Sequence, residues 1–291
     1  MVITAASVKE LRDISGAGMM DAKKALIETG GDKEAAIDWL RSKGLAKAAK
    51  KSGRIATEGL VSVRISDEAA VLIEINSETD FVAKNSDFQN MVSNISDAAV
   101  NVSSLGELKN IKIDNQSIDD LIADNIAKIG ENINLRRLLK IDGGNFSSYV
   151  HNPAAEDMGK IGVVVSLSSH NQELGRQLAM HIAASNPASL SENDLSQELI
   201  EREKQILTEQ AKESGKPDSV IESMIAGRMK KFFEEVTLLN QKFVINPQVT
   251  VKQVLDESNL SINSFARLEV GEGIDKIDED FAAEVEKTAN V

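Results

Sequence analysis

The sequence predicts a multi-domain α+β protein, and three observations support this fold class. At 291 residues, the chain has room for about two domains that each bury a core. Apolar residues recur with helical spacing in the first 45 positions and alternate with a period of two from position 61 onward. Between positions 195 and 225 the apolar residues show helical spacing only, without strand-like alternation. These patterns indicate, in order, a helical unit, a mixed core and a helical insertion.

The first unit, residues 1–54, reads as three short helices followed by a basic linker. The first helix carries Val8 and Leu11 at helical spacing and stops at residues 16–18, Gly-Ala-Gly. The second begins at Met19, and the third is capped by Asp32 and ends at Gly44. A unit with so small a core is more plausibly a recognition module than a catalytic domain.

The contact residues of this module are expected on its second helix, namely Met19, Met20, Lys23 and Lys24. The alternative places the methionines in the core and the lysines in water. The linker, residues 41–54, contains six basic residues and no acid. It is either a solvated basic segment or a docking patch for an acidic partner surface.

The core is predicted at residues 55–185, and it continues at 235–270. Alternating strands at 61–65 and 71–75 precede a helix that contains Phe88, which makes a β-β-α unit. A strand at 161–167 and a helix behind it repeat the pattern, so the core looks internally duplicated. Between the two copies, Ser117 opens a helix that runs through Ile129, and strands follow at 135–141 and 147–151.

Residues 186–234 are predicted to form an antiparallel helical hairpin inserted into the core. Residues 213–217, Glu-Ser-Gly-Lys-Pro, join the two helices: a helix stop is followed by a helix-breaking proline. Strand-like sequence resumes at 243–245 and 265–270. The remaining stretch, 271–291, is expected to contain a helix from Asp278 to Thr288 with Phe281, Ala282 and Val285 on one side.

Composition narrows the function classes. The net charge of −13 argues against broad binding to nucleic-acid phosphates, so no direct nucleic-acid partner is expected. The chain has no apolar run of membrane-spanning length and no layout typical of a secretory signal, so no membrane partner is expected either. The absence of cysteine excludes disulfides and thiolate nucleophiles, and the cytoplasm is the expected compartment.

Signals for catalysis are weak, and we expect a binding protein with no catalytic residue, no metal site and no cofactor. The three histidines have neither the spacing of a zinc-binding helix nor a neighbouring serine elbow. His181 lies on an apolar helical stripe, which favours a core histidine. His151 follows a strand close to Tyr149, and a surface role and a structural role stay equally open for it.

The loop Ser-Glu-Thr-Asp-Phe-Val-Ala-Lys, residues 77–84, is the most informative stretch of the core, because an acid and a phenyl ring stand together at a strand end. Judged from the residues alone, Phe81 is favoured as a staple that packs onto the following helix. The alternative is that Phe81 contacts a partner.

Several motifs resemble the elongation factor Ts family. They are VKELRDISGAGMMDAKKAL (8–26), TDFVAKN (79–85), AKIGENINLRR (127–137), MHIAAS (180–185), GRMKKF (227–232) and EVGEG (269–273). The similarity extends from end to end and keeps the order of the motifs. Ser15 and Ala22 stand where the family often has threonine and cysteine, and segments 66–70 and 103–116 are less similar.

This resemblance implies a guanine-nucleotide exchange factor that binds elongation factor Tu in its GDP-bound and nucleotide-free states. It implies a ubiquitin-associated-type N-terminal domain, a duplicated α+β core, a coiled-coil protrusion and a C-terminal helical module. A dimer or a heterotetramer stays open as the assembly. Two alternatives from other classes are a structural adaptor without exchange activity and an α+β enzyme that uses His151 and nearby acids.

The resemblance also implies roles for single residues. Phe81 acts as an apolar wedge near the partner's Mg²⁺ site, Asp80 disturbs the polar network that holds the metal, and Thr79 and Val82 shape the turn.

Four further positions carry over as partner contacts. Lys23 lies on the contact face of the N-terminal domain. Ile129 and Gly130 form a small-residue approach point, and His151 matches the histidine that follows the family's tyrosine.

Overall fold

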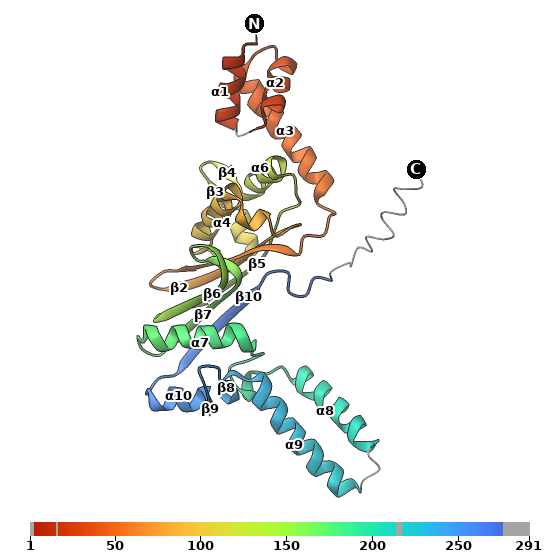
Figure 1. Ribbon diagram of the computed structural model, residues 1–291, viewed down its shortest axis with the longest axis vertical. Helices are drawn as coiled ribbons and strands as arrows, with labels where there is room; N and C mark the ends of the chain where they lie inside the picture. Colours follow the sequence, from red (N-terminus) through yellow and green to blue (C-terminus); the bar gives the residue numbers. More distant parts are fainter. Residues whose placement is uncertain (1–2, 16, 214–216, 276–291) are drawn as a thin grey trace.

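The computed structural model describes residues 3–15, 17–213 and 217–275. Figure 1 shows an elongated molecule with small helices at one end, a mixed core in the middle and a helical hairpin at the other end. The predicted α+β class is therefore confirmed. Among the described helices, none is both long enough and apolar enough to cross a membrane.

Three helices open the chain: α1 (Ala5–Ser15), α2 (Met19–Glu28) and α3 (Lys33–Lys51). Leu11, Leu26 and Ala36 lie in a small buried cluster between them, and the Asp32 side chain accepts a hydrogen bond from the Ala35 N–H at 3.0 Å. Met19 and Met20 are 46% and 75% exposed, so the alternative that placed the methionines in the core is wrong.

Helix α3 differs from the prediction, because it does not end at Gly44 and continues to Lys51 through the expected linker. Gly44 is buried against α6, where a Cβ at position 44 would lie 3.6 Å from Ala127 Cβ. A glycine inside a helix costs only about 1 kcal/mol. The alanines and lysines that follow it favour helix, and packing on α6 outweighs that cost.

Six strands form one antiparallel sheet in the order β10-β7-β1-β2-β5, with β6 also paired to β7. Their bounds are β1 (Glu58–Ile65), β2 (Ala69–Ser77), β5 (Asn134–Asp142), β6 (Phe146–Ala155), β7 (Met158–Leu167) and β10 (Ile262–Glu269). The strands predicted at 61–65, 71–75, 135–141, 147–151 and 161–167 all lie within them.

The two halves of this sheet pack face to face. Val61 of β1 and Leu72 of β2 share a buried cluster with Val164 of β7 and Leu268 of β10. Gly162 permits the close approach, since a Cβ there would lie 2.6 Å from Val61 Cγ1. The sheet therefore curls back on itself instead of remaining open.

Helices cover the outer face of each half. Helices α4 (Ser86–Ala99) and α6 (Ile118–Ile129) bury Phe88, Ile95 and Ile122 against β2. Helix α7 (Gln172–Ser185) packs Leu178 and Ile182 against β7. Each half thus has the chain order strand, strand, helix, and the two helical layers lie on either side of the strands in Figure 1.

Several small elements were not predicted. They are α5 (Leu105–Lys109), β3 (Lys112–Ile113), β4 (Gln116–Ser117), η2 (Glu192–Asp194), η3 (Leu238–Asn240), β9 (Asn246–Thr250) and α10 (Val251–Glu257). Strand β8 (Lys242–Phe243) includes the first residue of the strand expected at 243–245. The expected strand at 243–245 is wrong beyond Phe243, because Val244 and Ile245 form an exposed turn between β8 and β9. The helix expected at 278–288 lies outside the described residues.

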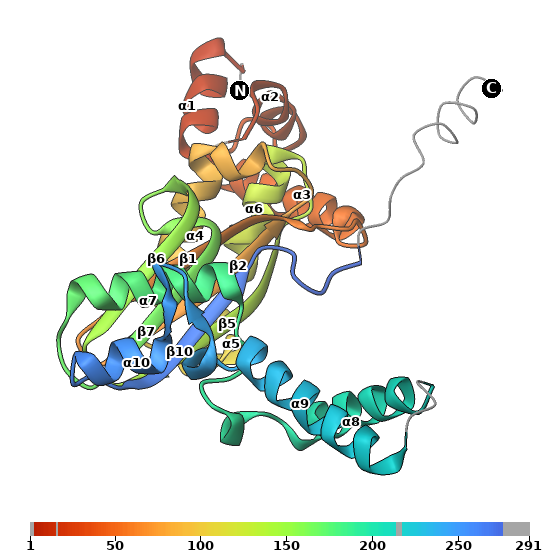
Figure 2. The same cartoon turned by 60° about the horizontal axis from the view of Figure 1, so that its bottom comes forward.

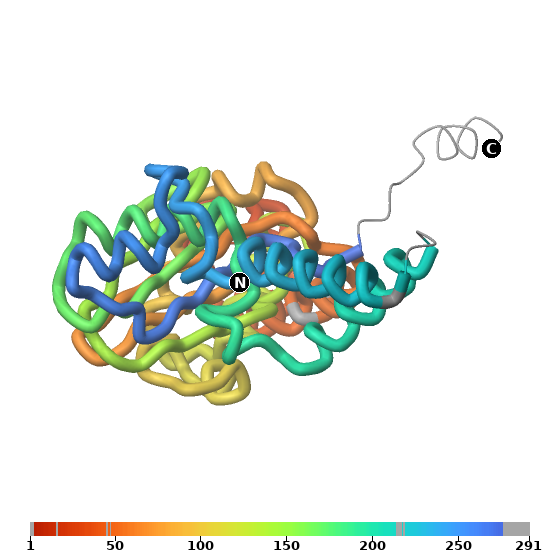
Figure 3. The backbone as a smooth tube through the Cα atoms, turned by 90° about the horizontal axis from the view of Figure 1, so that it is seen from below, coloured from red at the N-terminus to blue at the C-terminus, as the bar shows by residue number. Residues whose placement is uncertain are grey.

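The hairpin consists of α8 (Gln197–Lys212) and α9 (Asp218–Val236). Figures 2 and 3 show it projecting sideways from the strands. Its two ends lie side by side, since Ala188 N–H donates to Val236 O at 2.8 Å and Leu238 N–H donates to Ser189 O at 2.9 Å. The chain therefore leaves and re-enters the core at one point.

One buried charge joins distant parts of the core. Glu74 of β2 is fully buried, and its carboxylate accepts hydrogen bonds from Arg136, Arg137, the Asn76 side chain and the Gly271 N–H. Burial by itself raises the pKa of Glu74. The hydrogen bonds from Gly271, Asn76 and Arg137 outweigh burial and hold the pKa below its ordinary value of 4.5.

Our first prediction concerns the hairpin. Replacing residues 190–235 with a short glycine-containing turn should leave the core folded, because its ends are already adjacent and closing a short loop costs little. The far-ultraviolet circular dichroism should lose helical signal, while the remaining core should still unfold cooperatively on heating. Loss of cooperative unfolding would show that the hairpin is part of the core.

Our second prediction concerns Glu74→Gln, which keeps the shape of the side chain and removes its charge. We expect the free energy of unfolding at neutral pH to fall by about 3 kcal/mol, because two arginines lose their buried counter-charge. The pKa of Glu74 is lowered on folding, so its contribution is complete above pH 4.5 and disappears as the pH falls through the folded-state pKa.

Urea denaturation of wild type and Glu74→Gln at neutral pH, and in steps below pH 4.5, measures this difference. The gap between the two proteins should narrow as the pH falls. Glu156→Gln, at an exposed turn between β6 and β7, is the matched control and should track the wild type. A gap that stays constant at every pH would contradict the assignment.

Candidate functional site

The loop after β2 is a short, fixed turn. All nine residues of β2 are buried, so the strand reaches its end at Ser77 without freedom to shift. The Ser77 hydroxyl donates to Thr79 O at 3.0 Å. A 3₁₀ turn, η1 (Val82–Lys84), follows, and the Asn85 side chain then caps α4 by accepting from the N–H groups of Asp87 and Phe88. Both ends of the loop are therefore anchored.

Within this loop the apolar side chains point in opposite directions. Val82 and Ala83 are buried in the cluster beneath α4. Phe81, directly before them, is 77% exposed and is the most exposed large apolar side chain among the described residues. The interpretation of Phe81 as a staple on the following helix is therefore wrong. Burying Val82 while Phe81 takes a helical backbone conformation turns the ring outward.

Asp80 lies beside Phe81 and is also exposed. Within the part of the chain that the structure describes, its carboxylate accepts no hydrogen bond and forms no ion pair. A free carboxylate and a bare phenyl ring are thus presented together on a rigid support, which is the arrangement of a contact surface and not of a packed core.

A second loop supports the first. The Glu131 carboxylate accepts two hydrogen bonds from Thr79, one from the N–H at 2.9 Å and one from the hydroxyl at 2.6 Å. The Glu78 carboxylate in turn accepts a hydrogen bond from the Asn132 N–H. Residues 77–82 and 129–132, far apart in the sequence, are held against each other by this pair of acids.

Ile129 and Gly130 belong to that second loop. Ile129 ends α6, and Gly130 follows it in the left-handed conformation with φ of 89°, which favours glycine. The carbonyl of Gly130 accepts a hydrogen bond from Lys51 at the end of α3. The structure therefore brings the two predicted positions next to Thr79 and also ties them to the N-terminal helices.

His151 lies on β6 and is exposed, and its Nδ1 is 3.1 Å from the Tyr149 hydroxyl. The same strand reaches the loop farther along, where the Gln89 side chain donates to both Ala83 O and Ala154 O. His181, by contrast, is fully buried, as predicted. Its Nδ1 accepts from the Val244 N–H at 3.2 Å and its Nε2 lies 2.9 Å from Gln241 Oε1, so the ring is neutral.

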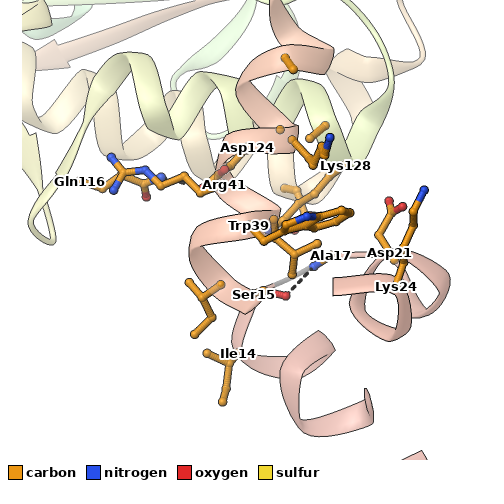
Figure 4. A pocket seen from close by; sticks show the side chains of 18 of the residues that line it. Ile14, Ser15, Ala17, Asp21, Lys24, Trp39, Arg41, Gln116, Asp124 and Lys128 are labelled. Carbon is orange, nitrogen blue, oxygen red and sulfur yellow. Dashed lines mark hydrogen bonds between the residues drawn. The ribbon is translucent and has the colours of Figure 1, made fainter. Parts of the chain in front are cut away.

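Lys23 is exposed on α2 and lies apart from the loop. Near it, a groove of about 880 Å³ separates the N-terminal helices from α6, and we call it the N-terminal groove. Figure 4 shows Ile14 and Trp39 of the helical unit together with Asp124 and Lys128 of α6 along this groove. Exposed Ile14, Met19 and Met20 make the outer surface of the unit apolar.

Arg41 pairs with Asp120 and joins the two walls of the N-terminal groove. The Ser117 hydroxyl, and after it the Arg41 guanidinium, lower the pKa of the Asp120 carboxyl, although partial burial opposes them. Two basic residues of the stretch 41–54 therefore make contacts within the chain. Arg41 pairs with Asp120 of α6, and Lys51 donates a hydrogen bond to the Gly130 carbonyl just after α6.

Within residues 3–15, 17–213 and 217–275, no group of three or more His, Asp or Glu side chains is placed to hold a metal ion. The site is an exposed surface on a rigid turn, not an enclosed cavity.

Sequence reasoning missed the supporting acids. Glu78 and Glu131 were not singled out, and they look like ordinary surface residues in the sequence. Glu74 did leave a signal, since it is an acid in the middle of a buried apolar strand. Arg136 and Arg137 appear in one of the quoted motifs, but their common partner is visible only in the fold.

Comparison with known proteins identifies one family. The family model described as "Elongation factor TS" matches residues 78–272. The chain is 62% identical over 292 aligned residues to the elongation factor Ts of Paracoccus denitrificans, covering 99% of both chains. It is 60% identical to that of Dinoroseobacter shibae over 100% of both chains, and 58% identical to that of Roseobacter denitrificans over 99% of both.

Our third prediction tests the support of the loop. Glu131→Gln keeps one acceptor oxygen but loses the charge, so it should weaken both hydrogen bonds to Thr79. Hydrogen bonds to charged groups contribute about 1.5–3 kcal/mol, so amide exchange at Thr79 should be at least about tenfold faster. Exchange within β2 and the melting temperature should change little, and Glu156→Gln is the control. Unchanged exchange at Thr79 would show that Glu131 does not hold the loop.

Proposed function

The chain belongs to the elongation factor Ts family of translation elongation factors, and from this premise we propose that it is a guanine-nucleotide exchange factor for elongation factor Tu. It acts by binding the GDP-bound partner, weakening the hold on GDP and Mg²⁺, and releasing the partner when GTP rebinds. The observation that supports this most directly is the pair Asp80 and Phe81, exposed on a turn that cannot easily move.

Exchange of this kind needs no bond to be made or broken. In a GTPase, Mg²⁺ and backbone N–H groups of the phosphate loop hold the nucleotide phosphates. A protein that fits the nucleotide-free shape better than the loaded shape lowers nucleotide affinity. By linkage, the factor by which it weakens GDP binding equals the factor by which GDP weakens its own binding. The exchange factor therefore needs a rigid surface that only the distorted partner can accommodate.

Phe81 meets that requirement. Its ring is already exposed in the free protein, and Val82 and Ala83 are buried directly behind it. Because the turn is preformed, little conformational entropy is lost when the ring enters the partner. We propose that Phe81 inserts between partner helices near the Mg²⁺ site as an apolar wedge, and that Thr79 and Val82 hold its turn in place.

Asp80 supplies a charge at the same point. Its carboxylate has no partner within the described residues, so it is free to act on groups of another protein. We propose that it competes for the polar groups that hold the partner's Mg²⁺. An anion placed near that site also attracts the metal away from the phosphates, which adds an electrostatic effect to the wedge.

Other surfaces then complete the interface. We propose that Lys23 and the apolar face of the N-terminal helices contact the GTPase domain, and that Ile129 and Gly130 allow its backbone to approach closely. His151, exposed on the strand that reaches the loop, is a further contact.

We retain the predicted division of the chain as part of this proposal. A ubiquitin-associated-type domain with its basic segment at 1–54 and a duplicated core at 55–185 and 235–270 form the gripping surface. A coiled-coil protrusion at 186–234 is inserted into the core, and a C-terminal module at 271–291 also contacts the partner. Helix α3 packs against α6 of the core in the structure, and the first boundary, after residue 54, falls between the end of α3 at Lys51 and the start of β1 at Glu58. We place the interaction in the cytoplasm, with a dimer or a heterotetramer of the two proteins still open.

Our fourth prediction concerns Phe81→Ala and Asp80→Asn. Truncating an aromatic anchor often costs about 2 kcal/mol or more at an interface, so Phe81→Ala should slow GDP release from elongation factor Tu more than tenfold at limiting concentration. Its own melting temperature should not change, because the ring is exposed. Asp80→Asn should also slow release, and its defect should shrink when Mg²⁺ is removed by chelation.

Stopped-flow release of labelled GDP measures both variants against two controls. Phe81→Leu keeps an apolar side chain and should retain part of the activity. Ile65→Ala removes an exposed apolar side chain at the end of β1, which pairs with the start of β2 and so lies away from Phe81. This variant should behave like the wild type. Normal release with Phe81→Ala would refute the wedge, and binding without any acceleration by the wild type would identify an adaptor instead.

A further inference from the structure

Residues 130–132 lie between the N-terminal helices and the loop 77–82. On the side of the loop, the Asn132 N–H donates a hydrogen bond to the Glu78 carboxylate. On the other side, the Asn132 side-chain amide donates to the Arg54 carbonyl, just after the end of α3, at 2.7 Å. Asn132 is thus bonded in both directions, through its main chain to the loop and through its side chain to the end of the N-terminal unit.

Burial makes the side-chain bond of Asn132 stronger than the ion pairs around it. Asn132 is only 7% exposed, so water cannot easily replace this bond when it is lost. Arg54 and Glu78 also form an ion pair at 3.4 Å, but the Arg54 side chain is 55% exposed. Arg41, which pairs with Asp120 from an earlier turn of α3, is 53% exposed. Exposed ion pairs stabilise only weakly, so the buried amide holds the end of α3 more firmly than either pair.

Packing of α3 on α6 holds the two helices together without fixing their orientation. Gly44 is buried against α6, and Ala48 is partly buried against the core. Small apolar residues present a smooth face, and hydrophobic contact has no preferred direction, so this face alone permits rotation. Figure 1 shows α3 running from the first two helices past α6 toward the strands. A small rotation at the end of α3 would therefore move the whole N-terminal unit, and a directional bond is needed there to prevent it.

We propose that Asn132 is a positioning residue, which fixes the orientation of the N-terminal helices relative to the loop 77–82. A partner that is gripped at two places gains affinity only if both contact surfaces face it at once. Holding the helices in place prepares this geometry in the free chain and lowers the ordering cost of binding. The orientation is a property of the free chain, whereas its effect on nucleotide exchange rests on the proposed function.

Distances between spin labels measure the orientation directly, because the chain contains no cysteine that would take up label elsewhere. Lys9→Cys on α1 and Asn90→Cys on α4 place one label on each side of the joint, at exposed helical positions. Pulsed electron paramagnetic resonance of the full chain, without any partner, should give one narrow distance distribution. Adding Asn132→Ala should widen this distribution roughly twofold, because the helices gain freedom to rotate.

Asn125→Ala is the matched control. Asn125 is 6% exposed, and its side-chain amide donates to the Leu121 carbonyl at 2.9 Å. The control loses an equally buried bond that lies within α6, so the distribution should stay narrow whatever happens to the melting temperature. If Asn132→Ala does not fold, Lys51→Met, which removes the donor to the Gly130 carbonyl, takes its place in the same measurement. A distribution as narrow in the variant of the joint as in Asn125→Ala would overturn the proposal.

Stopped-flow release of labelled GDP from elongation factor Tu measures the consequence for exchange. The main-chain bond from Asn132 to Glu78 survives in Asn132→Ala, so Phe81 keeps its place and the maximal rate should stay within about twofold of the wild type. The concentration that gives half of this rate should rise at least about fivefold, since the two contact surfaces no longer face the partner together. Asn125→Ala should change neither quantity.

Two further outcomes separate this inference from the proposed function. A lower maximal rate with an unchanged half-saturating concentration would overturn the positioning role of Asn132. A widened distance distribution, together with no acceleration of GDP release by the wild type, would support the orientation and refute only the proposed function.

Discussion

The fully buried carboxylate of Glu74 is the interaction on which the arrangement of the core depends. It lies in β2, between β1 and β5, and it neutralises Arg136 and Arg137 of β5 while accepting a hydrogen bond from the Gly271 N–H. Burying a charge is costly, and only a complete set of hydrogen bonds offsets that cost. The carboxylate thereby ties together three segments that are far apart in sequence, and it sets where the chain leaves the sheet after β10.

Rigidity at the end of β2 explains how an exposed aromatic ring can be maintained. An exposed phenylalanine on a mobile loop would pack onto the nearest apolar surface. Here Val82 already occupies the core position behind it, and Glu131 holds Thr79 from the other side. The contacts that stabilise the loop are thus made by its neighbouring residues, and Phe81 remains exposed for contact with a partner. The same logic makes the supporting acids as important to binding as the residues that touch the partner.

Helix α3 connects this loop to the N-terminal surface. Its pairing of Arg41 with Asp120 and its hydrogen bond from Lys51 to Gly130 both end on α6 or the loop after it. Gly44 is buried against α6 between those points. The apolar face of the first three helices and the turn that carries Phe81 are thus parts of one connected frame, which is what a protein needs if it grips a partner at two places.

The sequence by itself determined the α+β class, the strands of the core, the helical hairpin and the prominence of Asp80 and Phe81, because period, turn residues and caps are local properties. It did not determine that α3 passes through Gly44, since packing on α6 outweighs a local helix preference of about 1 kcal/mol. Judged from its residues alone, the sequence favoured a buried Phe81. In the structure Val82 occupies the core position instead, and Phe81 is exposed. The joining of Thr79 to Glu131 and of Glu74 to Gly271 is decided only by the tertiary structure, because contacts across more than fifty residues leave no periodic trace in the chain.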